Sequence, residues 1–234
     1  MKKTAVLIHG AGGGGWEYTL WEPVFRKAGW RTLAPDLVPA ASGLEQTQLS
    51  DYVGQVLAAV PKDAAPLVFI GASMGGLLAL AAAAQRKPAA LVLVNSVPPK
   101  GVPWPRTESK PSPPVVRWAN GPLQETRDSM PDSDEKTIQF AWKRWRDESG
   151  AVLNTLHAGV ELPNPSCPTL VVIGERDTDI PPETSVALAT RLHADLHRYA
   201  GMSHVGPLLS TRAPEVAAAT ERWLTVATTR ENRR

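Results

Sequence analysis

The chain has 234 residues, of which 43% are hydrophobic and 21% charged, and its formal net charge is +2. This length accommodates one large α/β domain with its own core, and so small a net charge gives no indication of a nucleic-acid partner. The single cysteine, Cys167, excludes an intrachain disulfide. The first apolar run, residues 5–8, is too short for a signal peptide, and no segment approaches the ~18 apolar residues of a membrane span. We therefore expect a cytoplasmic protein without a membrane partner.

Short apolar segments alternate with segments of helical periodicity along the chain. In chain order we expect a strand at residues 4–10, a helix at 16–30, a strand at 31–37, a helix at 44–60, a strand at 66–73, a helix at 77–86 and a strand at 89–99. After a long irregular stretch there follow a strand at 168–177, a helix at 185–192, a weaker strand at 194–201 and a helix at 213–227. This alternation predicts a doubly wound α/β domain with right-handed crossovers.

The expected strands are continuously apolar, as in "LVFI", "LVLV" and "TLVVI". Strands of this kind are buried on both faces, which is typical of a mostly parallel sheet covered by helices. In such sheets, ligands bind beyond the carboxyl ends of the strands. The residues that directly follow each strand are therefore the first candidates for a functional site.

Residues 98–165 interrupt the pattern, and no clear strand is expected there. The segment begins proline-rich, has helical character at 133–159, where we expect two short helices, and contains four of the eight tryptophans: Trp104, Trp118, Trp142 and Trp145. We interpret it as a cap inserted into a core formed by residues 1–97 and 166–234. A variable excursion whose aromatic residues only attach it to the core is the alternative, and the two interpretations are compatible.

The sequence Gly71-Ala72-Ser73-Met74-Gly75 matches the pattern G-x-S-x-G between an apolar strand and an alanine-rich helix. Such a sharp turn holds a serine in a strained conformation, and the flanking glycines avoid a collision. The N-terminus of the following helix can stabilise an oxyanion, with the Met74 N–H as the natural first donor. The alternative is a glycine-rich turn in which Ser73 only caps the helix.

A glycine-rich loop follows the first strand in "LIHGAGGGGW". Its backbone can approach a ligand closely and direct a second N–H group at an oxyanion. Gly10, Gly12 and Gly15 also satisfy G-x-G-x-x-G, and Asp36 lies about 20 residues on, so a dinucleotide site is a further alternative. Against it, no helix follows the loop promptly.

Two later loops supply an acid and a base. Asp177 lies at the end of the strand at 168–177, three residues past Gly174, and Asp179 is close behind it. His204 lies in "GMSHVGP", after the last strand. Either aspartate could instead be an exposed acid near the start of a helix, and most lone histidines are structural or exposed. The order Ser…Asp…His is one of the convergent arrangements of a catalytic triad, and the strand ends place all three at one edge of the sheet.

Together, "LIHGAGGGGW", "APD", "IGASMGG", "VIGERDTDIPPE" and "GMSHVGP" resemble the α/β-hydrolase superfamily over essentially the whole chain, most closely its small single-domain serine esterases and related lyases. The resemblance implies that Asp177, rather than Asp179, is the acid, that Ala11 supplies the second oxyanion N–H, and that His204 is the base. It also implies a cap at residues 98–165.

We therefore predict a serine hydrolase that cleaves an ester, lactone or thioester of a small, apolar substrate through Ser73, His204 and Asp177. Gly12, Trp104, Trp142 and Trp145 are the candidate pocket residues. No metal or organic cofactor is expected. A lyase or C–C bond hydrolase of the same fold, and a receptor that keeps the triad with little turnover, remain alternatives because one fold hosts many functions.

Overall fold

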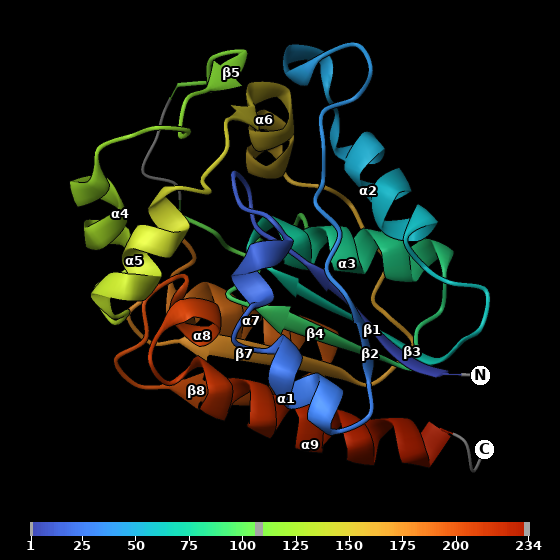
Figure 1. The fold of residues 1–234 in the computed structure, drawn as a ribbon. Helices are drawn as coiled ribbons and strands as arrows, with labels where there is room; N and C mark the ends of the chain where they lie inside the picture. Colours follow the sequence, from blue (N-terminus) through green and yellow to red (C-terminus); the bar gives the residue numbers. More distant parts are fainter. Residues whose placement is uncertain (1, 106–109, 232–234) are drawn as a thin grey trace.

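The computed structural model describes residues 2–105 and 110–231, and six of its strands form one parallel sheet. The strand order is β2-β1-β3-β4-β7-β8, and every neighbouring pair is parallel (Figure 1). The bounds are β1 (Lys2–Ile8), β2 (Arg31–Leu33), β3 (Ala64–Ala72), β4 (Ala90–Val94), β7 (Thr169–Gly174) and β8 (Asp195–Tyr199). The predicted doubly wound α/β architecture is confirmed.

Two hydrophobic cores lie on opposite faces of this sheet. Successive strand residues alternate between them, so that Val6 and Ile8 belong to one core and Ala5 and Leu7 to the other. Helices α2 (Leu49–Ala58), α3 (Met74–Gln85) and α7 (Pro182–Leu192) pack into the first core. Helices α1 (Glu22–Lys27), α8 (Gly206–Leu209) and α9 (Ala213–Glu231) pack into the second (Figure 1). Burial on both faces explains why the strands are continuously apolar.

Two of the predicted helices are shorter than expected, and each is preceded by a 3-10 turn. Residues 16–30 divide into η1 (Gly15–Tyr18) and α1, because Pro23 lacks an N–H and fits only the first turn of a helix. Residues 44–60 divide into η2 (Leu44–Gln46) and α2, which begins after a reciprocal capping box between Gln48 and Asp51.

The segment between β4 and β7 contains more regular structure than its sequence predicted. Helices α5 (Glu135–Trp142) and α6 (Gly150–Ala158) correspond to the two short helices expected at 133–159. The structure adds α4 (Leu123–Ser129) and a short antiparallel pair, β5 (Val115–Val116) with β6 (Glu148–Ser149). Figure 1 shows α4 and α5 beyond the carboxyl ends of the central strands.

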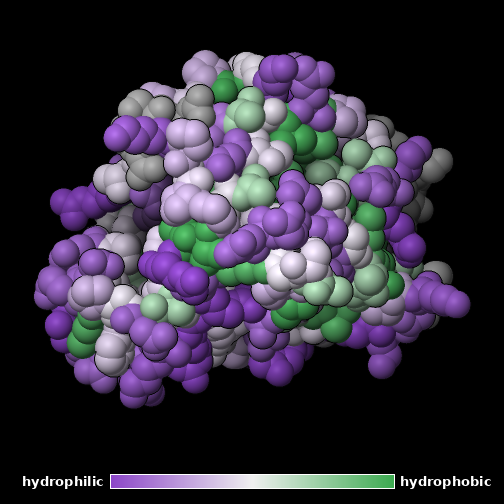
Figure 2. Space-filling view, turned by 90° about the horizontal axis from the view of Figure 1, so that it is seen from above, coloured by the Kyte–Doolittle hydropathy of each residue, from purple (hydrophilic) through white to green (hydrophobic). Residues whose placement is uncertain are grey.

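The surface seen from above is mostly polar, and its apolar residues gather in small, separated areas (Figure 2). Of the large hydrophobic side chains among the described residues, Val38, Trp118 and Val226 are the exposed ones. None of the described helices is long and apolar enough to span a membrane.

Candidate active site

Ser73 lies at a sharp turn between β3 and α3. Its φ of 53° and ψ of −123° fall in a region that side-chain-bearing residues seldom adopt. Backbone bonds hold the turn on both sides, because the Ser73 N–H donates to the Val94 carbonyl at 3.0 Å and the Ser73 carbonyl accepts from Val97 and Gly76, also at 3.0 Å. Strain of this kind costs on the order of 1–3 kcal/mol and persists only where the surroundings enforce it.

The glycines around Ser73 are required by close backbone approach. A Cβ atom on Gly71 would lie 2.0 Å from the Gly75 carbonyl oxygen, and one on Gly75 would lie 2.1 Å from the Ile8 carbonyl oxygen. Both obstacles are main-chain atoms, which cannot move aside as a flexible side chain can. The G-x-S-x-G pattern is therefore a steric condition for this turn.

The helix-capping interpretation of Ser73 does not describe this geometry. Ser73 occupies the N-cap position of α3, yet its side chain makes no capping hydrogen bond. Ser73 instead lines a cavity that His204 also lines. The strained turn thus places Ser73 in the lining of a cavity.

His204 and Asp177 form a hydrogen-bonded pair beside this cavity. The His204 Nδ1 lies 2.8 Å from Asp177 Oδ2, and the Asp177 side chain is fully buried. The second oxygen, Oδ1, accepts the N–H groups of Asp179 and Ile180, both at 2.9 Å. An ionised carboxylate only accepts hydrogen bonds, so Nδ1 carries the proton and Nε2 is free to act as a base.

Asp179 occupies a different position from Asp177. Its Oδ2 lies 3.9 Å from Nε2 of His204, on the cavity side of the ring, and its side chain is 67% exposed. Solvent screens so exposed a charge. The buried carboxylate on Nδ1 is thus the one placed to orient the imidazole.

Two opposing effects act on the pKa of His204. Burial lowers the pKa, whereas the charge of Asp177 and its hydrogen bond raise it, with further contributions from Asp179 and Glu17. The net pKa of His204 is raised above its usual value of 6.5. The acidic neighbours thus stabilise the imidazolium form.

The loop that carries His204 is held by two residues that the sequence patterns did not single out. Asn95, directly after β4, donates to the His204 carbonyl at 2.7 Å and accepts the Gly174 N–H at 2.8 Å. Asp132, from the inserted segment, accepts the Ser203 hydroxyl at 2.6 Å. The polar residue at the end of "LVLVN" was the only available sequence signal, and it concerns Asn95 alone.

Most backbone N–H groups of the glycine-rich loop, residues 10–15, donate hydrogen bonds to other groups of the protein. Gly10 donates to Glu17 at 3.1 Å, Gly12 to Glu148 at 3.0 Å, Gly13 to the Gly10 carbonyl at 3.3 Å, and Gly15 to Asp36 at 2.8 Å. Within residues 2–105 and 110–231, no intramolecular hydrogen bond uses the N–H of Ala11. Ala11 lines the same cavity as Ser73, so its N–H is available to a ligand.

The N–H of Met74 is available as well, because Met74 is the first residue of α3 and its N–H has no intrahelical partner. The hydrogen bonds of the glycine-rich loop also argue against a dinucleotide site. Asp36, which would contact a ribose in such a site, instead accepts the N–H of Gly15, a residue of that loop.

The inserted segment clamps the glycine-rich loop. The Arg146 N–H donates to the Gly12 carbonyl at 2.7 Å, and its guanidinium donates to the Gly13 carbonyl. The buried Glu148 carboxylate accepts the Tyr52 hydroxyl at 2.8 Å in addition to the Gly12 N–H. The loop is therefore fixed from the side of the insertion as well as from the sheet.

His9 is part of this support and not of the base chemistry. Its Nδ1 lies 2.7 Å from the Gly10 carbonyl, and its Nε2 accepts the Leu37 N–H at 2.9 Å. Burial and, to a lesser degree, the nearby Arg146 charge lower the pKa of His9 to about 4, against the opposing effects of the Gly10 hydrogen bond and the Asp36 charge. His9 is thus neutral near pH 7.

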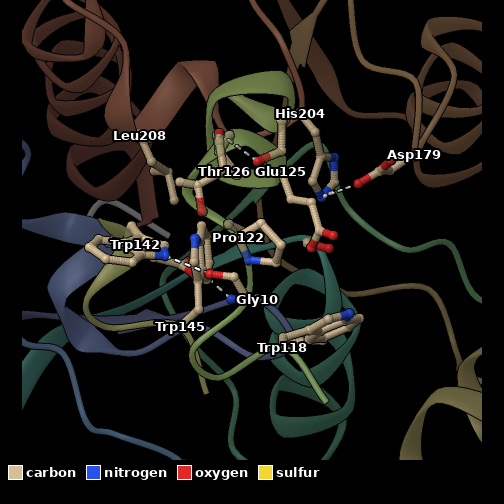
Figure 3. A pocket seen from close by; sticks show the side chains of 17 residues that line it. Gly10, Trp118, Pro122, Glu125, Thr126, Trp142, Trp145, Asp179, His204 and Leu208 are labelled. Atoms are coloured by element: carbon tan, nitrogen blue, oxygen red, sulfur yellow. Dashed lines mark hydrogen bonds and ion pairs between the residues drawn. The ribbon is translucent and has the colours of Figure 1, made fainter. Parts of the chain in front are cut away.

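A cavity of about 380 Å³ connects these groups (Figure 3). The core contributes Ser73, His204, Ala11 and Glu17, and the inserted segment contributes Trp142, Trp145 and Trp118. Two of the predicted pocket residues, Trp142 and Trp145, therefore line the cavity. Trp118 and Glu17 line it too, although neither was predicted to, because only the tertiary fold brings them there.

The other two predicted pocket residues lie outside this lining. The Trp104 ring packs 5.4 Å from the His157 ring, and its Nε1 donates to the Asp179 carbonyl at 3.0 Å, so Trp104 lies behind the acidic loop. Gly12 contacts the Trp118 indole, since a Cβ atom built on Gly12 would lie 2.3 Å from Trp118 Cε3. Gly12 thus supports the wall of the cavity from outside.

No group of three or more His, Cys, Asp or Glu side chains among the described residues could hold a metal ion.

The chain matches the model of the alpha/beta hydrolase family over residues 5–219, and it belongs to that family. A search of curated proteins found no match.

Solved structures with the same fold include polyneuridine aldehyde esterase, at 18% identity and a TM-score of 0.74, with 96% of this chain and 100% of that chain covered. A methylesterase from Arabidopsis is 16% identical with a TM-score of 0.72 and coverage of 96% and 99%. A pyrethroid hydrolase from Sphingobium faniae JZ-2 is 20% identical with a TM-score of 0.72 and coverage of 95% and 97%.

Proposed function

We propose that this protein is a serine hydrolase that cleaves carboxylic esters of small molecules through an acyl-enzyme. The observation that carries the proposal is the meeting, in one cavity, of a serine held at a strained turn and a histidine whose Nδ1 is bonded to a buried aspartate. The esterase and hydrolase names of the similar structures agree with it.

In the first half of the reaction, Ser73 Oγ attacks the ester carbonyl carbon while His204 Nε2 takes the hydroxyl proton. Asp177 holds the imidazole in the required tautomer and stabilises the imidazolium. The N–H groups of Ala11 and Met74 bind the carbonyl oxygen as it becomes negative. A single donor of this kind contributes on the order of 3 kcal/mol to the transition state.

The tetrahedral intermediate then breaks its bond to the leaving oxygen, which takes the proton from His204 and departs as the alcohol. A water molecule gives a proton to His204 and attacks the acyl-enzyme. Collapse of the second intermediate returns that proton to Ser73 Oγ and releases the carboxylic acid.

We further propose that residues 98–165 act as a cap on a core formed by residues 1–97 and 166–234. Its indoles enclose the cavity beside Ser73, and Arg146 and Glu148 hold the loop that carries Ala11. In this proposal, the cap sets the shape of the substrate site and also positions one oxyanion donor.

The test is a hydrolysis screen of p-nitrophenyl esters of increasing acyl length, together with thioesters and lactones, on the wild type and on Ser73→Ala. We expect turnover of at least one ester by the wild type and its loss in the variant. Absence of turnover on every substrate by the folded wild type would contradict the proposal and favour a receptor. Cleavage of a C–C bond by the same serine, without ester hydrolysis, would favour the lyase or C–C hydrolase alternative.

A further inference from the structure

The cavity around Ser73 has an acidic lining. Three carboxyl side chains, Glu17, Glu125 and Asp179, line it, and among the described residues no lysine or arginine does. His204 is the only basic side chain in this lining, and Asp177 already pairs with it. Carboxylates repel an anionic group and give a neutral substrate no ionic partner, whereas they attract a cation.

Glu17 is the most unusual of the three because it is buried, whereas Glu125 and Asp179 are exposed. Its side chain belongs to η1, the residue is only 4% exposed, and Oε2 accepts the Gly10 N–H at 3.1 Å. The carboxyl group lies directly against the backbone of the glycine-rich loop, since a Cβ atom on Gly13 would be 1.7 Å from Oε1. Among the described residues no lysine or arginine forms an ion pair with Glu17.

Indole rings form the other walls. Trp142 and Trp145 lie on one side of the cavity and Trp118 on another (Figure 3). Trp142 is fixed by its Nε1, which donates to the Gly121 carbonyl at 2.7 Å, and Trp145 by an edge contact with Trp16 at 4.9 Å. Trp118 is 40% exposed, and it is the only tryptophan among the exposed large hydrophobic side chains of the described residues. The face of an indole attracts a cation.

We propose that the ester hydrolysed at this site carries a positively charged nitrogen, which binds between the indole rings and the carboxyl groups of Glu17 and Glu125. This inference rests on the proposed function and names the class of its substrate. It replaces the small apolar substrate expected from the tryptophans alone.

The proposal has a consequence for pH, because Glu17 changes its charge close to neutrality. Burial raises the pKa of Glu17 from 4.5 to about 7, against the opposing effects of the Gly10 N–H, His204 and Arg146. The charged or titratable groups that face it are His204 from the loop before α8, Arg146 from the insertion, and Tyr18 from its own turn. As pH rises through 7, Glu17 ionises and its attraction for a substrate cation increases.

The experiment compares butyrylcholine with 3,3-dimethylbutyl butyrate, in which a carbon atom replaces the charged nitrogen at equal size. We expect the ratio of kcat/KM, charged over neutral, to exceed one at about pH 8 and to be roughly tenfold larger there than at about pH 6. Glu17→Gln keeps the shape of the side chain and an acceptor for the Gly10 N–H but has no charge. Its ratio should therefore not change with pH.

Asp36→Asn is the matched control. Asp36 also accepts an N–H of the glycine-rich loop, from Gly15, but it is exposed and does not line the cavity. In this variant the ratio should rise with pH as in the wild type. Faster hydrolysis of the neutral ester at about pH 8, or a pH-dependent ratio that persists in Glu17→Gln, would overturn the proposal. A wild-type unfolding curve, followed by circular dichroism, shows that each variant is folded.

A second measurement does not depend on turnover. Tetramethylammonium should quench tryptophan fluorescence and bind the wild type more tightly at about pH 8 than at about pH 6, while neutral 3,3-dimethylbutanol should show no such change. Cation binding without ester hydrolysis would refute the proposed function and retain only the cation-binding site. Ester hydrolysis without cation binding would refute the inference and retain the function.

Discussion

The core loops and the inserted segment contribute to the site in different ways. Around Ser73 the backbone is so crowded that main-chain atoms determine which residues can stand there. In the insertion, side chains such as Trp118 and Glu125 reach the cavity from exposed positions. In the proposed function the core carries the reacting groups, and the insertion adds the indole rings and Glu125 that would contact the substrate. Substitutions in the two regions should therefore fail in different ways.

The largest effect on kcat is expected for Asp177, the proposed acid of the triad. Asp177→Asn should lower kcat by about 10³–10⁴-fold, because an amide can hold the wrong tautomer of His204. Asp179→Asn should change kcat by less than about fivefold, since its exposed carboxylate does not touch Nδ1. Steady-state kinetics on a neutral ester measures both. A larger loss of kcat in Asp179→Asn than in Asp177→Asn would show that Asp179, and not Asp177, orients His204.

Because the core is crowded around Ser73, substitutions of its glycines should lower the stability of the protein. Gly75→Ala should lower the free energy of unfolding by about 3 kcal/mol or more, because its methyl group would lie 2.1 Å from the Ile8 carbonyl oxygen. The matched change in the insertion, Gly121→Ala, should cost less than about 1 kcal/mol, since its nearest obstacle is the Glu125 side chain at 3.3 Å. Urea unfolding of both variants would test this, and equal losses would mean that the core is no more crowded than the insertion.

The pH dependence of the core chemistry follows from His204. Its Nε2 must be unprotonated to act as a base, and its pKa is raised above 6.5. On a neutral ester, kcat/KM should thus fall about tenfold per pH unit as pH drops below that pKa. A profile that stays flat to about pH 6 would show that no such base limits the reaction.

The smallest effect is expected at the tryptophans of the insertion. Trp142→Leu should raise KM for an ester about three- to tenfold with little change in kcat, because the indole lines the cavity and its hydrogen bond goes to the Gly121 carbonyl of the insertion. Trp104→Leu is the control, since Trp104 packs behind the acidic loop. Comparable KM changes in the two variants would contradict the assignment of the cavity wall.

Local patterns in the sequence account for the sheet, the serine turn and the positions of Asp177 and His204. Each of these depends on residues near in the chain or on the rule that parallel strands end at one edge. The remaining features depend on long-range contacts. Nothing around Glu17 indicates burial beside Gly10, and nothing in the proline-rich stretch indicates that Trp118 reaches the cavity whereas Trp104 does not. The two-residue strands β5 and β6 are too short to show any periodicity.

The central claim is that Ser73 is an activated nucleophile, and covalent labelling tests it most directly. A fluorophosphonate probe should react with the folded wild type, and mass spectrometry should place the adduct on the peptide that contains Ser73. Ser73→Ala should remain unlabelled while keeping the wild-type unfolding curve. No labelling of the folded wild type, or equal labelling of the Ser73→Ala variant, would contradict the account.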